Sequence, residues 1–64
     1  MVSEILKKEL VNSIGKEVIL YLENGFRHEC RILDCDEEFI KIFDLIKQKN
    51  KTIRIIQISE MEVK

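Results

Sequence analysis

The side chains of this sequence that could bind a metal ion are His28, Cys30 and Cys35. A structural zinc site takes about four such ligands, usually with a pair of cysteines two to four positions apart, and the sequence offers no second pair. A catalytic triad is not indicated either, because the histidine has no serine beside it at a strand turn. A disulfide between the two cysteines would be disfavoured in a reducing cytoplasm. We therefore expect free thiols, no metal, no cofactor and no enzymatic activity.

Charged residues divide the middle of the chain into an acidic and a basic segment. Positions 34–38 hold four acids and no base, which is typical of a solvated turn. The basic residues that follow are Lys41, Lys47, Lys49, Lys51 and Arg54. Only Asp44 opposes them between positions 41 and 54, so the segment could bind phosphate in a salt-dependent and largely sequence-independent way. The alternative is a lysine-rich loop that keeps the chain soluble.

A helix and a set of strands must position these side chains. The helix is expected over residues 3–14, with Ser3 as its N-cap and Gly15 just after its end. Its apolar stripe is Leu6, Leu10 and Ile14. From Lys16 the apolar period changes from about 3.6 to about 2 residues, which predicts strands. These strands are expected at about 16–23, 26–33, 38–45, 52–58 and 60–63, with an Asn24-Gly25 hairpin turn between the first two and a polar loop at 47–51.

Length and composition limit the class of protein. The 64 residues suffice for one domain, over 1–64, and the formal charge of −1 excludes both a basic nucleic-acid tail and a disordered acidic chain. No apolar run approaches the ~20 residues that a transmembrane helix needs, so no membrane association is expected. The first ten residues lack the apolar stretch of a signal peptide, so we expect a cytoplasmic protein.

The expected fold is mainly β: an N-terminal α-helix followed by a five-stranded, strongly bent antiparallel small barrel. With 45% hydrophobic residues, so short a chain has more apolar surface than its own interior can bury. The expected oligomer-interface residues are Ile53, Ile55, Ile56, Ile58, Met61 and Val63. Strands of this composition would promote aggregation as free edges, which predicts that they pair with a second copy.

The segment from Gly15 to Gly25 resembles the first Sm motif, which begins with Gly-Lys, continues with alternating apolar residues and has a glycine in its hairpin. Ile32 and Asp36 match the apolar residue and the aspartate that follow in that motif. The sequence is therefore similar to the Sm-like (LSm and Hfq-like) family over nearly its whole length. The resemblance implies a cyclic homo-oligomer, a hexamer or heptamer, in which the fourth strand of one subunit pairs with the fifth of its neighbour. It also implies single-stranded RNA as a partner.

Several positions depart from the motifs of that family. Cys30 stands where the family often has a glycine, Glu38 where uridine-binding members place a stacking residue, and Ile40 where they place an asparagine. The second motif, usually Ile-Arg-Gly, is Ile-Arg-Ile at positions 53–55. The resemblance therefore implies a uridine pocket of atypical composition.

We thus expect a non-catalytic Sm-like ring that binds RNA through one of its surfaces. The expected RNA contacts are Asp36, Phe39, Arg54, Lys41, Lys47, Lys49, Lys51 and Tyr21. Tyr21 could stack on a base, or it could be a half-buried barrel residue. Two other functions stay open: a protein-interaction or structural ring that has lost RNA binding, and an unrelated SH3-like barrel, which would be a monomer.

Overall fold

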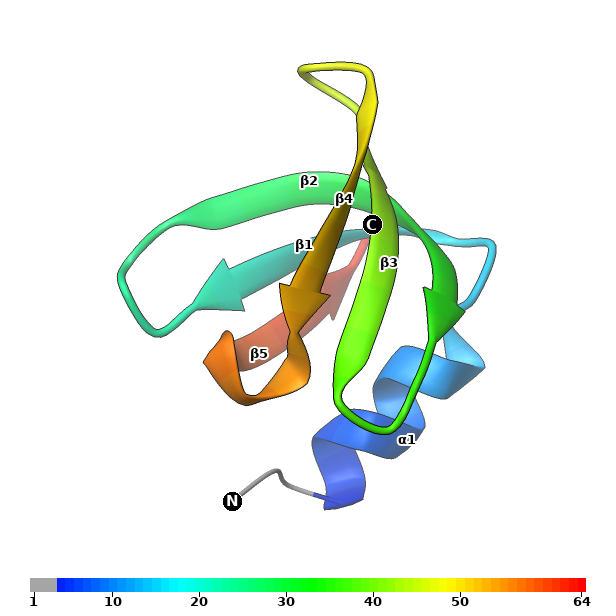
Figure 1. Cartoon of the computed structure of the whole chain (residues 1–64), viewed down its shortest axis with the longest axis vertical. Coiled ribbons are helices and arrows are strands. Elements are labelled where there is room, and N and C mark those ends of the chain that lie inside the picture. The colour runs from blue at the N-terminus through cyan, green and yellow to red at the C-terminus, as the bar shows by residue number, and fades with distance from the viewer. Residues whose placement is uncertain (1–3) are drawn as a thin grey trace.

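One helix and five strands make up the computed structural model, which describes residues 4–64 (Figure 1). The elements are α1 (Glu4–Asn12), β1 (Glu17–Leu22), β2 (Arg27–Cys35), β3 (Phe39–Asp44), β4 (Lys49–Arg54), the 3-10 turn η1 (Ile55–Gln57) and β5 (Ile58–Val63). The expected N-cap, Ser3, lies outside the described residues. This order confirms the predicted fold class, a helix followed by five antiparallel strands. Among residues 4–64, no helix is both long enough and apolar enough to span a bilayer.

Helix α1 ends where a glycine allows the chain to turn sharply into the sheet. Leu10 is fully buried, so it fixes the apolar face of the helix against the core. Gly15 adopts a φ of 88°, a conformation that side chains with a Cβ rarely take. Its N–H donates to the carbonyl of Ile32 on β2 at 2.7 Å, which joins the turn to the sheet. The helix ends at Asn12 rather than at the predicted position 14, because residues 13–15 form this turn.

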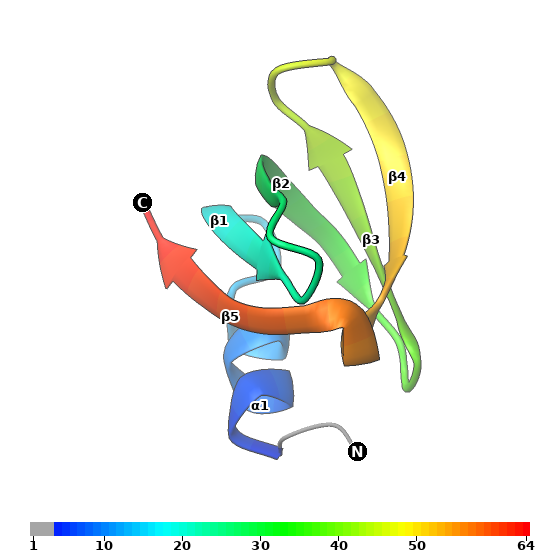
Figure 2. The same ribbon diagram turned by 90° about the vertical axis from the view of Figure 1, so that its left-hand side faces the viewer.

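The five strands form one antiparallel sheet in the order β4-β3-β2-β1-β5. The long strand β2 contains a bulge between Ile32 and Asp34, where the sheet bends. The bend brings β5 back alongside β1, so that β5 and β4 are the two ends of the sheet (Figure 2). Within residues 4–64, both outer edges of this sheet are therefore without a partner strand.

The core lies inside the bend and consists of alternate residues from the strands, with one helix residue. The buried apolar side chains are Leu10, Val18, Leu20, Cys30, Ile32, Ile40, Ile42, Ile53, Ile55 and Ile58. The period of two residues expected from Lys16 onward is visible in the burial of the first three strands, where Val18, Ile32 and Ile40 are each fully buried.

The fourth strand differs from its predicted bounds of 52–58. It begins at Lys49, inside the stretch expected to be a loop, because Gln48 (φ 56°) completes a tight turn and lets Lys49 pair with Asp44. It ends at Arg54, where η1 redirects the chain toward β1. The N–H of Ile55 donates to the carbonyl of Glu38 at 2.9 Å, and the carbonyl of Gln57 accepts from the N–H of Glu23 at 2.8 Å. These two hydrogen bonds hold the η1 turn in place. The turn was not predicted, because the isoleucine-rich sequence is compatible with a continuous strand.

Candidate nucleic-acid interface

An aromatic ring and a guanidinium lie together on the outer face of the β3–β4 hairpin. Phe39 and Arg54 are paired across the two strands, and the guanidinium carbon lies 5.9 Å from the ring centroid. Because the neighbouring residues Ile40 and Ile53 point into the core, both side chains point outward. The ring is 38% exposed. An exposed ring with a cation over it can stack on a nucleic-acid base and attract the adjacent phosphate.

The next pair along the hairpin, Lys41 and Thr52, continues this outer face. With Phe39, Asp34 and Asp36 they line an open hollow of about 280 Å³. The hollow thus combines one aromatic ring, one ammonium group, one hydroxyl and two carboxylates. The carboxylate of Asp36 accepts a hydrogen bond from the backbone N–H of Glu37, so it also supports the turn between β2 and β3.

A second hollow, of about 240 Å³, lies on the other side of Arg54. It is lined by Glu37, Glu38, Arg54 and Ile56. Glu37 forms an ion pair with Lys7, whose ammonium lies 2.9 Å from its carboxylate. This hydrogen bond to Glu37 is the main reason that the pKa of Lys7 is raised. The acidic turn therefore borders the Phe39–Arg54 pair on both sides.

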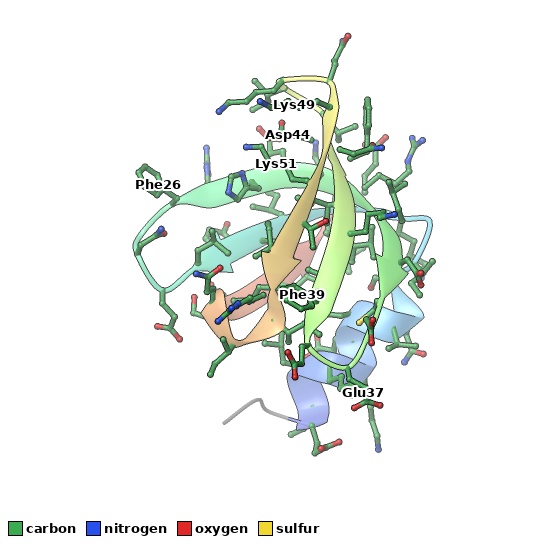
Figure 3. All side chains as sticks on the ribbon, viewed as in Figure 1. Phe26, Glu37, Phe39, Asp44, Lys49 and Lys51 are labelled. Carbon is green, nitrogen blue, oxygen red and sulfur yellow. The ribbon has the colours of Figure 1, made fainter. Side chains whose placement is uncertain are left out.

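The basic segment that the sequence suggested is divided in the structure. Figure 3 shows Phe39 near one end of the β3–β4 hairpin and Lys49, Lys51 and Asp44 near the other. Lys51 lies 3.4 Å from the buried carboxylate of Asp44, so its charge is compensated inside the protein. Lys41 and Arg54 therefore share a surface with Phe39, while Lys49 and Lys51 belong to the far tip of the hairpin.

Asp44 organises that tip. Its carboxylate accepts hydrogen bonds from the backbone N–H groups of Ile46 (2.9 Å) and Lys47 (3.0 Å). The bond from the Lys47 N–H, followed by those from Ile46 and Lys51, holds the pKa of Asp44 below its ordinary value. His28 Nδ1 lies 3.7 Å from the same carboxylate.

Tyr21 does not lie with Phe39. It is on β1, and strand β2 separates β1 from β3. Its hydroxyl donates to Glu62 on β5 at 2.9 Å, and this bond is the main cause of its raised pKa. Glu60 is its partner across the strand pair. Arg27 on β2 is its partner on the other side, so Tyr21 lies between acidic and basic side chains and apart from the surface of Phe39.

The two cysteines are free. Burial, and secondarily the charge of Asp44, raises the pKa of the Cys30 thiol to about 11. Cys35 is half-buried, and burial is again the main reason for its raised pKa. Within the described part of the chain, no group of three histidine, cysteine, aspartate or glutamate side chains is arranged to hold a metal ion.

Three of the six residues expected at an oligomer interface have their side chains in the core of the protomer itself. Ile53, Ile55 and Ile58 are 8%, 0% and 4% exposed, because strand alternation and the η1 turn direct them inward. Ile56 and Val63 are exposed, and Met61 packs partly against the core. These three residues could therefore contact a neighbouring subunit only through their backbone atoms.

A set of exposed apolar side chains that was not expected from the sequence lies outside the last two strands. The most exposed are Ile5 and Ile46, each at 73%, and Phe26 at 67%. Phe26 directly follows the Asn24-Gly25 turn, Ile46 lies within the turn between β3 and β4, and Ile5 lies one position off the apolar stripe of α1. Exposure of these side chains could have been predicted, because each is an apolar residue in or next to a turn or beside the buried stripe of a helix.

Comparison with known proteins identifies the fold. No protein-family model matches the sequence, and a search of curated proteins finds no match. Among solved structures, the chain is similar to a crystal structure of the pleiotropic translational regulator Hfq. The two share 26% sequence identity and superpose with a TM-score of 0.80, over 94% of this chain and 100% of the other. This similarity confirms the Sm-like, Hfq-like fold predicted from the sequence.

Proposed function

We propose that this chain is an Sm-like, ring-forming protein that binds single-stranded RNA without catalysing a reaction. The fold supports this proposal, because it is shared with a translational regulator over nearly the whole chain. The observation that carries RNA binding is the exposed Phe39 ring with the Arg54 guanidinium over it. Single-stranded RNA is bound mainly by aromatic stacking combined with cations near the phosphates, and this pair offers both.

The proposed RNA surface consists of Phe39, Arg54 and Lys41, with Asp34 and Asp36 at its margin. The carboxylates weaken the attraction for phosphate and, among the described residues, this surface has only two cations, so affinity should rest mainly on stacking and fall only modestly as salt rises. Glu38 and Ile56 line the adjoining hollow and provide neither an aromatic ring nor an amide side chain. Selectivity for uridine should accordingly be low.

The ring is supported by the two free edges of the sheet. Strands β4 and β5 are each six residues long and form its two ends. Strand β4 carries three bases and no acid, while β5 carries two acids and no base. The edges are thus complementary in charge, which favours head-to-tail pairing of β4 with the β5 of a neighbour. Closing six or seven copies into a ring would leave no free edge.

A filter-binding titration tests RNA binding. Oligo(U), oligo(A) and a structured RNA are each titrated at low and at moderate salt. We expect both single strands to bind and affinity to fall as salt rises. Phe39→Ala should weaken binding about tenfold or more, because stacking on one aromatic ring contributes ~1–3 kcal/mol. Phe26→Ala, which removes another exposed phenylalanine ring, is the matched control and should leave affinity unchanged.

The outcome also decides between this proposal and a protein-interaction or structural ring that has lost RNA binding. That second function is favoured by the acids at positions 34–38, two of which line the same hollow as Phe39. If none of the three RNAs binds at low salt, RNA binding is ruled out and the second function takes its place. If Phe26→Ala weakens RNA binding and Phe39→Ala does not, RNA does not bind at the Phe39–Arg54 pair.

Light scattering after size-exclusion chromatography tests the ring. The expected mass is six or seven times the 7.6 kDa of one chain. The double variant Glu60→Lys and Glu62→Lys places like charges on both edges, so it should reduce the assembled fraction, most strongly at low salt. Glu37→Lys, which reverses one exposed acid outside the edge strands, is the control. A monomer at micromolar concentration would contradict the ring.

A further inference from the structure

An apolar groove with an acidic rim runs between α1 and the corner that leads from β4 into β5. Its volume is about 390 Å³. In Figure 2, α1 lies beneath β5. The apolar lining includes Ile5 and Leu6 from α1, Ile56 from η1, and Ile58 and Met61 from β5. Three separate elements therefore build one concave surface.

The groove presents apolar surface that this fold does not bury. The stripe of α1 that faces the core passes through Leu6 and Leu10, which leaves Ile5 beside the stripe and 73% exposed. Ile56 lies at the middle of η1, where the backbone turns its side chain outward, and it is 56% exposed. Two isoleucines exposed on one groove are a typical feature of a protein contact site.

The charges around the groove are all of one sign. Of the residues that the structure describes, Glu9, Glu23 and Glu60 belong to its lining, and no lysine, arginine or histidine does. The hollow that holds the other exposed apolar pair, Phe26 and Ile46, differs, because its lining includes Arg27, His28 and Lys47. The groove would therefore repel a phosphate chain and attract cations.

We propose that this groove is a docking site for a peptide segment of another protein, one that carries lysine or arginine next to aliphatic side chains. The aliphatic side chains would contact Ile5 and Ile56, and the cations would lie near the three glutamates. Charge complementarity selects this occupant over RNA. The proposal does not depend on RNA binding, because the groove and the hollow that contains Phe39 have no lining residue in common. Ile56 is shared with the hollow beside Arg54, so the test relies on Ile5, which lines the groove and neither of those hollows.

Fluorescence anisotropy with short labelled peptides tests the proposal. The probes are a lysine–leucine peptide, a glutamate–leucine peptide and a lysine–serine peptide of equal length. The groove requires both apolar contact and positive charge, so only the lysine–leucine peptide should bind well. Its affinity should fall as salt rises, because the rim charges are exposed.

Matched variants locate the binding. Ile5→Ser should weaken binding of the lysine–leucine peptide about tenfold, because most of the Ile5 side chain is available for burial. Ile46→Ser is the control, since Ile46 is the same residue type at the same 73% exposure, in the other hollow. Glu9→Gln should weaken binding about two- to fivefold, and Glu4→Gln, on the same helix but outside the groove, should not. Circular dichroism confirms that each variant is folded.

Three results would overturn the proposal. The first is equal binding of the lysine–leucine peptide to the wild type and to Ile5→Ser. The second is competition in which oligo(U) displaces the peptide from the wild type, which would place RNA in the groove. The third is a change in assembled mass caused by Ile5→Ser, since the groove would then be occupied by a second copy of the chain. Failure of RNA binding elsewhere would leave all three readouts intact.

Discussion

Replacing Asp44 with alanine should destabilise this protein more than any other change of a single acid to alanine. The substitution leaves the N–H groups of Ile46 and Lys47, now bonded at 2.9 and 3.0 Å, without an acceptor. It also removes the carboxylate 3.4 Å from the ammonium of Lys51. Two hydrogen bonds to a charged group contribute ~1.5 kcal/mol each, so the loss is about 3 kcal/mol. In a domain of this size that corresponds to a fall in Tm of about 12–24 °C.

The same carboxylate makes stability depend on pH. The pKa of Asp44 in the folded chain lies below its ordinary value of 3.8, chiefly because the Lys47 N–H stabilises the charged form. The contribution of the ionised Asp44 to the free energy of unfolding is therefore fully present above the pKa that Asp44 has in the unfolded chain. It is lost as pH falls from about 5 through 3.8 and then through the lower pKa of the folded chain. Asp44→Asn should flatten this part of the stability profile, because it has no carboxyl group to protonate.

Thermal melts followed by circular dichroism at pH 7, 5, 4 and 3 provide the measurement. Asp34→Asn and Asp34→Ala are the controls, because Asp34 is exposed and accepts a single local bond, from the N–H of Cys35. A fall in Tm of less than about 4 °C for Asp44→Ala at pH 7 would refute the role given to Asp44. If the Tm of Asp44→Asn fell as steeply with decreasing pH as that of the wild type, the titration of Asp44 would not be the cause of the pH dependence.

Two further changes follow from local geometry. Gly25 has a φ of 90° and open space around the position of an added Cβ, so Gly25→Ala should cost only the backbone strain of ~1–2 kcal/mol, seen as a lower Tm; an unchanged Tm would contradict this conformation. Labelling with a thiol reagent at pH 8 should modify Cys35 slowly in the folded protein and Cys30 only after unfolding, because Cys30 is fully buried and its pKa is raised to about 11. Equal rates for the two thiols would mean that Cys30 is accessible.

Local signals in the sequence were sufficient for the first four elements. The helix, its glycine ending and the Asn24-Gly25 hairpin each depend on residues that are neighbours in the chain. The same holds for the buried faces of β1, β2 and β3, where apolar residues stand at every second position. The Phe39 and Arg54 positions were named as well, although the sequence did not indicate that one would lie over the other.

Prediction from the sequence failed where apolar residues follow one another without a regular period. The isoleucines at 53, 55, 56 and 58 form a run that is compatible with a continuous strand, so the η1 corner was not visible. Their assignment to an interface followed from composition alone. In the structure three of them complete the core, while apolar surface remains exposed elsewhere, at Ile5, Phe26 and Ile46.

The sequence by itself determined the kind of elements and their order, because propensity, periodicity and turn chemistry act over short distances. The Sm-like fold was implied by the resemblance of residues 15–36 to the first Sm motif. The tertiary structure decided which charges act together. Lys51 follows Lys49 closely in the chain, yet the register of β4 on β3 directs its ammonium to the buried Asp44. The same register places Arg54 over Phe39 and leaves β4 and β5 as edges of opposite charge. Such pairings depend on strand register and on burial, which are properties of the folded chain.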